Sequence, residues 1–281
     1  MAKNLRHTLT PRRLANSVLL LLLIILGFAI GRTVAGIRPP HGRCGPCGGL
    51  ITSTENFDSA TPPVLPILWL ATNALGPRPL WVTSDSGLPM PSADTPPNSA
   101  FIDDPDVVSD KRLDSMSFSF FEGCCPQLSF RHNFNLEASD SDPGVGFDGG
   151  VLELSTDGGN TFQEIPDSAF VVGGYNRSIS GDRGSPIAGR QAWSGNSGGF
   201  ITSVVNLPTI QTPGAGRLRW RMASDNTGSG EGWRVDTVII SWCWMGQPCT
   251  PMPRPTPVAR PVPSVPPSLH ATPAFTPVPR P

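Results

Sequence analysis

Hydrophobic and polar side chains alternate along the middle of the chain. In residues 127–136, every second side chain is apolar or imidazole: Leu128, Phe130, His132, Phe134 and Leu136. Residues 217–222 alternate in the same way between arginine and apolar side chains. A period of two predicts strands that bury one face and expose the other. We therefore expect strands at residues 116–121, 127–136, 151–155, 200–205, 216–222 and 234–242.

The sequence FDGGVLELSTDGG, at residues 147–159, predicts one strand between two turns. Leu152 and Leu154 point to one face of this strand, and the residues between them point to the other. An Asp-Gly pair begins at Asp148 and another at Asp157. Such pairs are typical of turns, because glycine tolerates positive φ and aspartate can bond its own backbone.

Spaced strands separated by clusters of Gly, Pro, Asn, Asp and Ser predict an all-β fold. Apart from residues 18–30, no segment has a convincing helical period. We expect a jelly-roll β-sandwich over residues 55–245. Continued alternation in its last strand would place Arg234 and Asp236 on one face with three apolar residues: Val238, Ile240 and Trp242.

The first 35 residues predict export. A basic lead is followed by the apolar run at residues 18–30 and by small residues near Ala35. This order is typical of a secretory signal cleaved after Ala35, and equally of an uncleaved signal-anchor helix that would hold the protein in a membrane. We expect an extracellular or cell-surface protein in either case.

Proline and charge divide the rest of the chain. Residues 36–54 predict a linker, and the proline-rich, acid-free residues 246–281 predict a disordered tail of polyproline II character. Residues 55–236 hold all 22 acidic residues but only 11 of the 21 basic ones, a net charge of −11. This charge disfavours nucleic acid as a partner and is compatible with a divalent cation.

Six cysteines follow the export segment, an even number that suggests disulfides in an oxidising compartment. They are Cys44, Cys47, Cys124, Cys125, Cys243 and Cys249. Our preferred pairing joins the two cysteines of the linker CxxC motif to each other. One of the adjacent pair at 124–125 would then join one of the last two, although sequence alone leaves the connectivity open.

Motifs for catalysis are sparse. His132 is the one histidine in the predicted domain, and its place on the apolar face of a strand predicts a buried core residue. Residues 194–198 superficially resemble a serine-protease motif, but the chain has no GxSxG and no HExxH. Acids at turn edges, among them Asp103, Asp104 and Asp106, could supply oxygen ligands to a structural Ca²⁺ ion.

A combined order of short motifs resembles a known family. The motifs include ENFD at residues 55–58, LSFRH at 128–132, FDGGVLELS at 147–155, GRQAWSGNSGGF at 189–200 and GWRVD at 232–236. Together they are similar to the MAM-like, concanavalin-A-like jelly-roll modules of secreted bacterial proteins. The similarity is greatest to the non-catalytic module of immune-inhibitor-A-type peptidases, and it covers residues 55–243.

The resemblance implies an adhesive or accessory role and, in some members, a cation near the ends of the sheets. On that analogy the candidate metal ligands are Glu55, Asp58, Glu137, Asp148 and Asp236. No peptidase segment accompanies the module. Trp193, within the GRQAWSGNSGGF motif, is expected in the core rather than as a platform for a sugar ring.

The sequence therefore favours a non-catalytic binding or adhesion module, with an extracellular glycan or protein as its ligand. A structural, stalk-mounted domain without a dedicated ligand is the alternative. A glycosidase that uses two carboxylates is the third and least favoured reading.

Overall fold

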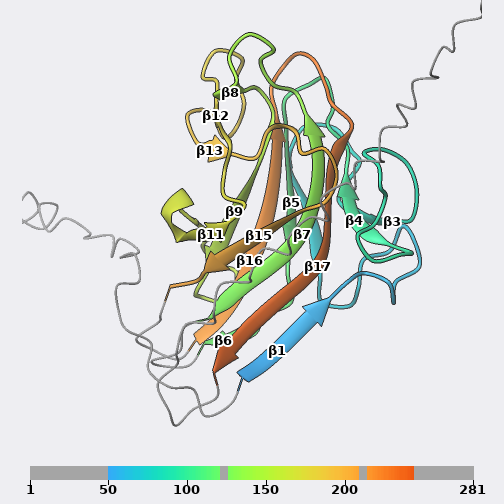
Figure 1. Ribbon diagram of the computed structural model, residues 1–281, viewed down its shortest axis with the longest axis vertical. Helices are drawn as coiled ribbons and strands as arrows, with labels where there is room; N and C mark the ends of the chain where they lie inside the picture. Colours follow the sequence, from blue (N-terminus) through green and yellow to red (C-terminus); the bar gives the residue numbers. More distant parts are fainter. Residues whose placement is uncertain (1–49, 121–125, 209–213, 244–281) are drawn as a thin grey trace, which may run out of the picture. The chain divides into compact units, whose positions relative to one another are not determined.

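The described part of the chain comprises residues 50–120, 126–208 and 214–243 of a computed structural model (Figure 1). The predicted signal or anchor, most of the linker and the whole proline-rich tail therefore lie outside the described residues. Five of the six cysteines also lie outside them, and Cys243 is the last described residue, of whose side chain nothing is described. No helix within the described ranges is long and apolar enough to cross a membrane.

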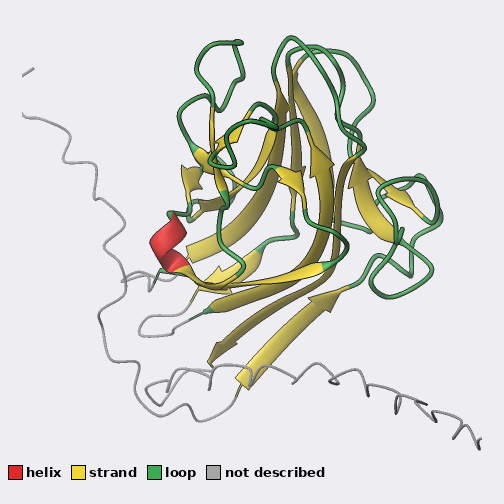
Figure 2. Cartoon of the chain, turned by 45° about the horizontal axis from the view of Figure 1, so that its top comes forward, coloured by secondary structure: helices red, strands yellow, loops and turns green. Residues whose placement is uncertain are grey.

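Two antiparallel sheets face each other and form a β-sandwich, as predicted (Figures 1 and 2). The larger sheet contains β1 (Leu50–Glu55), β3 (Val82–Ser84), β4 (Ser99–Ile102), β7 (Gln127–Leu136), β11 (Phe170–Val172), β14 (Gly195–Asn196), β15 (Ile201–Asn206) and β17 (Gly232–Cys243). Its main order is β11-β15-β7-β17-β4-β3, with β1 beside β17 and β14 beside β7.

The second sheet has the order β10-β9-β16-β5-β2, with β6 beside β16. Its strands are β2 (Leu70–Leu75), β5 (Ser109–Asp114), β6 (Phe118–Phe120), β9 (Gly149–Ser155), β10 (Gln163–Glu164) and β16 (Gly214–Ser224). A small third sheet contains β8 (Val145–Gly146), β12 (Arg177–Ile179) and β13 (Gln191–Ala192). The one helix in the described ranges is a 3-10 turn, η1 (Asp167–Ala169).

The core lies between the two sheets, and the predicted alternation builds it. All five predicted inward residues of β7 are buried, and from β16 Leu218, Trp220 and Met222 meet them. Aromatic rings fill the centre, where Trp220 lies edge-on to Phe130 with ring centroids 5.5 Å apart. Edge-to-face contacts of this kind stabilise a core beyond the area that they bury.

All six predicted strands exist, although most boundaries differ by one or two residues. The prediction missed the strands before residue 116 and the short strands β8 and β10 to β14. Among the longer strands that it missed, β5 shows why. Its sequence SDKRLD looks like a loop, but Asp110 and Asp114 on its outer face form ion pairs of 2.9 Å and 2.6 Å with Arg221 and Arg219 of β16. The sheet also begins at Leu50, so β1 includes residues 50–54, which the sequence assigned to the linker.

The turn predicted at Asp148-Gly149 is displaced, because the bend lies at Phe147 and Asp148 whereas Gly149 and Gly150 belong to β9. A Cβ atom on Gly150 would lie 2.5 Å from the ring of Trp233 in the opposite sheet. Glycine is therefore needed there for close packing of the sheets rather than for a turn. The second predicted turn is present between β9 and β10, where Gly158 and Gly159 have φ values of 78° and 103°.

The predicted alignment of residues along β17 is also wrong. The register against β7 shifts between Asp236 and Ile239, and Thr237 has φ 47°. A bulge adds one residue, so side chains beyond it change faces. Trp233 and Val235 are in the core before the bulge, and Val238 and Ile240 are in the core after it.

Candidate metal centre

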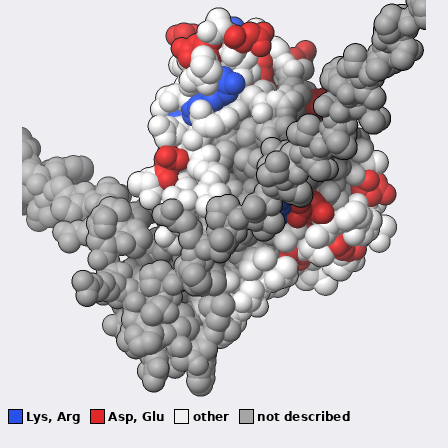
Figure 3. Space-filling model, viewed as in Figure 1, with Lys and Arg blue, Asp and Glu red and all other residues white. Residues whose placement is uncertain are grey.

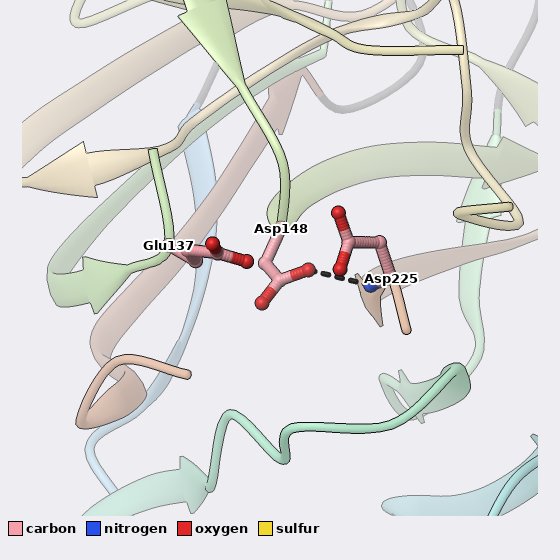
Figure 4. Close-up of side chains that lie close together, drawn as sticks. All are labelled: Glu137, Asp148 and Asp225. Carbon is pink, nitrogen blue, oxygen red and sulfur yellow. Dashed lines mark hydrogen bonds between the residues drawn. The ribbon is translucent and has the colours of Figure 1, made fainter. Parts of the chain in front are cut away.

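Four acidic side chains converge at one end of the sandwich, the end at which β7 ends and β17 begins. Asp104 follows β4, Glu137 follows β7, Asp148 immediately precedes β9, and Asp225 follows β16. The strand registers bring these ends together, because Trp233 of β17 lies opposite both Ile102 and Phe134. Figure 4 shows three of the carboxylates, which come from separate segments of the chain. One oxygen from each of these three lies within 4.8 Å of the others.

Backbone hydrogen bonds fix the positions of these carboxylates. Asp104 Oδ2 accepts from the amides of Glu137 at 3.1 Å and Gly230 at 2.8 Å. Asp148 Oδ1 accepts from the amide of Asp225 at 2.5 Å (Figure 4), and Asp225 Oδ1 accepts from that of Thr227 at 2.8 Å. Asp104 and Asp148 thus each use one oxygen to join separate rim segments, whereas Asp225 bonds within its own turn.

The other oxygen of each carboxylate accepts a hydrogen bond from no N–H or O–H donor of the described residues. These atoms are Asp104 Oδ1, Glu137 Oε2, Asp148 Oδ2 and Asp225 Oδ2, and all four are buried. The three aspartates are 5%, 0% and 1% exposed in chain order. A buried polar group without a partner costs about 1–3 kcal/mol, and more when it is charged. Four such oxygens at one place could bind a cation or share protons.

Burial raises the pKa of Asp148 far above its ordinary value, and the neighbouring charge of Asp104 raises it further. Burial also raises the pKa of Asp104, against hydrogen bonds to its carboxylate. The side chains of these two residues interact directly, so that a proton on one carboxyl would be shared with the other. A bound cation would replace that proton and favour both ionised forms.

The oxygen positions suit calcium. Oxygens within 4.8 Å of one another can all bind one ion at the Ca–O distance of roughly 2.3–2.6 Å. Calcium accepts six to eight oxygens in irregular geometry, whereas magnesium demands an octahedron and usually keeps several waters. An all-carboxylate, buried cluster therefore fits calcium better than magnesium.

Arg183 borders the site on its more exposed side. Its Nη1 donates to Glu137 Oε1 at 3.1 Å and lies 4.0 Å from Asp225 Oδ2. Figure 3 shows acidic and basic side chains gathered at this end of the visible face. The guanidinium neutralises only part of the charge of four carboxylates.

Two of the five predicted metal ligands, Glu137 and Asp148, lie in this cluster. The other three do not, and each has local hydrogen-bonding partners. Glu55 accepts from the amide of Phe57 at 2.7 Å, and Asp58 accepts from that of Asn98 at 3.0 Å. Asp236 accepts from three backbone amides at the bulge of β17, those of residues 94, 95 and 237. The structure therefore assigns these three carboxylates to loop anchoring.

Asp104 and Asp225 complete the cluster, and the sequence did not single them out as a pair of ligands. Asp104 was among the acids noted at turn edges, and Asp225 was not. Both directly follow or lie close to the end of a strand. An acidic residue next to the end of a predicted strand was the signal that the sequence offered for these two ligands. Only the pairing of the strands shows which strand ends lie together.

Two other predictions concern the core. His132 is fully buried and hydrogen-bonded, as expected, with Nε2 2.9 Å from Ser203 Oγ. Trp193 is also fully buried, and its indole donates to the carbonyl groups of Gly173 and Gly174. Trp193 therefore cannot stack on a sugar at the surface.

No family model and no curated protein matches the chain. Among solved structures, a carbohydrate-binding module in complex with beta-1,4-galactotriose is 10% identical, with TM-score 0.35 over 61% of this chain and 86% of that one. The K1 cleaved adhesin domain of Lys-gingipain from Porphyromonas gingivalis W83 is 14% identical, with TM-score 0.36 over 68% and 97%.

A third match is the enzymatically active domain of tailspike protein 4 from Bacteriophage CBA120. It is 11% identical, with TM-score 0.39 over 62% of this chain and only 19% of that one. None of the three is named as a MAM-like module, and the resemblance to that family stays a prediction. Function is argued below from the site itself.

Proposed function

We propose that the protein is an exported, non-catalytic binding module whose rim loops are organised by a calcium ion. The observation that carries this proposal is the set of four buried, unpartnered carboxylate oxygens from four strand ends. A cation bound there would join the segments that follow β4, β7 and β16 and the one that precedes β9. These loops would then offer a preorganised surface to an extracellular glycan or protein.

The burial of the cluster argues against the glycosidase alternative. Two carboxyl groups about 5 Å apart would suit a retaining glycosidase. Asp148 and Asp225 are 0% and 1% exposed, so a sugar ring could not reach them. The same burial suits a structural cation, which needs ligands but no substrate access.

Isothermal titration calorimetry of the chelator-treated full chain with CaCl₂ tests the cation. We expect one ion per chain and a Kd of about 10⁻⁴–10⁻³ M, the range of extracellular calcium modules. Asp148→Asn should abolish the binding heat, because a neutral amide replaces the most buried carboxylate. Asp140→Asn is the matched control, since Asp140 is exposed on the same loop. Absence of binding heat and of any calcium-induced thermal shift in the wild type would remove the calcium site from the proposal.

Glycan and protein arrays probed in CaCl₂ and in EDTA then test recognition. A module organised by calcium should bind its ligand in calcium and lose most of that binding in EDTA. A calcium-loaded protein that binds nothing on either array would favour the structural, stalk-mounted alternative.

A further inference from the structure

Arg183 occupies the place through which the buried carboxylates meet solvent. Its side chain is 37% exposed, whereas that of Asp225, 4.0 Å away, is 1% exposed. The same Nη1 that pairs with Glu137 also donates to Thr227 Oγ1 at 3.0 Å. The guanidinium carbon lies 3.8 Å from the ring centroid of Phe147, which supports its flat face. Arg183 is thus held over the cluster by an ion pair, a hydroxyl and an aromatic ring.

The backbone on both sides of Arg183 is loosely packed. A Cβ atom on either Gly181 or Gly184 would meet no heavy atom within 4 Å. Gly184 has φ 77°, a conformation that few other residues adopt. The backbone at these two glycines is therefore not confined by packing against other segments.

A guanidinium and a calcium ion would compete for the same carboxylates. Without the ion, Arg183 relieves part of the repulsion among four acids. With the ion present, its positive charge repels the metal at a separation of a few ångström, and Glu137 Oε1 cannot serve both cations fully. The Arg183 side chain therefore stabilises the site without the ion and lowers the affinity of the site for calcium.

We propose that Arg183 is an affinity-setting counter-ion of the calcium site, which substitutes for the metal when it is absent and is displaced when it binds. This inference rests on the proposed calcium site and adds a residue that limits its affinity. It places the site in the weak-binding range, where occupancy responds to the calcium level outside a cell.

Calorimetric titration of Arg183→Gln with CaCl₂ tests the inference. Removal of one charge near the ion should tighten Kd by about tenfold at low ionic strength, and by less at high salt. The melting temperature in EDTA should fall, and the calcium-induced increase should become larger. Arg183→Lys, which keeps the charge, should bind calcium with nearly wild-type affinity. Arg217→Gln is the control for net charge, because Arg217 lies beside Ser155 at the far end of β9 and should leave Kd unchanged.

The outcomes separate this inference from the proposed function. A wild type that binds no calcium contradicts the calcium site itself. A wild type that binds calcium, together with an Arg183→Gln variant of equal or weaker affinity, overturns the role of Arg183 alone. In the wild-type chain, the ¹⁵Nε resonance of Arg183 should also move when calcium is added, and an unmoved resonance would overturn the displacement.

Discussion

His132 is held in one tautomer by its neighbours in the core. The indole of Trp233 can only donate, and its Nε1 lies 3.3 Å from His132 Nδ1, which must therefore accept. The proton is consequently on Nε2 and is donated to Ser203 Oγ, which in turn donates to the carbonyl of Gly173. Complete burial lowers the pKa of His132 to about 3, so the neutral form persists in the folded protein well below neutral pH.

This burial predicts a loss of stability in acid. In the unfolded chain His132 takes up a proton below about pH 6.5, whereas the folded chain cannot do so until about pH 3. Burial of the neutral imidazole therefore costs no unfolding free energy above pH 6.5. As the pH falls from 6.5 toward 3, the unfolding free energy decreases by about 1.4 kcal/mol per pH unit because of His132. Urea denaturation of the wild type and His132→Phe from pH 4.5 to 7.5 measures it.

The difference in unfolding free energy between these two proteins isolates the histidine, because they share every carboxylate. We expect the unfolding free energy of the wild type to decrease relative to that of His132→Phe as the pH falls below 6.5. Two curves that stay parallel over this range would show that His132 is protonated equally in the folded and unfolded chains.

At the scale of elements, the sandwich depends on close approach of β9 to β17. An alanine at position 150 would place its Cβ 2.5 Å from Cζ3 of Trp233, whose ring is fully buried. Overpacking of this kind costs about 1–3 kcal/mol. We expect Gly150→Ala to lower the melting temperature by roughly 2–12 °C, as measured by circular dichroism.

Gly181→Ala is the matched control for that experiment. Its Cβ would meet no atom within 4 Å, and Gly181 is not among the residues with positive φ. A melting temperature equal to that of the wild type is expected. If the two substitutions behaved alike, contact with Trp233 would not be the reason for glycine in β9.

The bulge of β17 also organises a loop. Before the bulge, Arg234 is fully buried and donates to the carbonyls of Ser86, Leu88, Pro89 and Ser92. Asp236 accepts from amides a few residues further along the same loop. Both side chains face away from the core. The strand β17 therefore holds this loop through the positively charged side chain of Arg234 and the negatively charged side chain of Asp236. Burial without a carboxylate partner lowers the pKa of Arg234 to about 10.

At the scale of the whole molecule, the candidate metal centre and the ends of the described chain lie at opposite ends of the sandwich. Leu50 pairs with Cys243 at one end of β17, and Gly232 pairs with Asn135 at the other. The 12 residues of β17 span roughly 35–40 Å. The proposed binding rim therefore lies at the opposite end of β17 from Leu50 and Cys243, where the described chain begins and ends.

Calcium should stabilise the domain as one unit, because its ligands come from both sheets. At a calcium concentration of 100 times Kd, linkage predicts a gain of about 2.7 kcal/mol in unfolding free energy. That gain corresponds to an increase in melting temperature of roughly 5–11 °C. Scanning calorimetry in EDTA and in CaCl₂ should show a single transition that moves with calcium.

Asp148→Asn provides the contrast for this shift. The variant should be insensitive to calcium, and it should melt higher than the wild type in EDTA, because the metal-free wild type must bury a charge or take up a proton at Asp148 when it folds. A calcium-dependent shift in Asp148→Asn as large as that of the wild type would show that the ion binds elsewhere.

Local patterns determined much of the architecture. Alternation in residues 127–136 and 216–222 depends only on neighbouring side chains, so the inward faces of β7 and β16 could be predicted from the sequence. Paired charges concealed β5, because its partner arginines lie more than a hundred residues away. The bulge at Thr237 likewise depends on contacts with a distant loop, so simple alternation failed beyond it.

The sequence by itself determined an all-β sandwich with an acidic domain, and it identified Glu137 and Asp148 among five candidate ligands. Only the tertiary structure decided that these two meet Asp104 and Asp225, and that Glu55, Asp58 and Asp236 hold loops instead. The physical reason is that a strand's faces follow from a local period of two, whereas the meeting of four strand ends follows from register between segments distant in sequence.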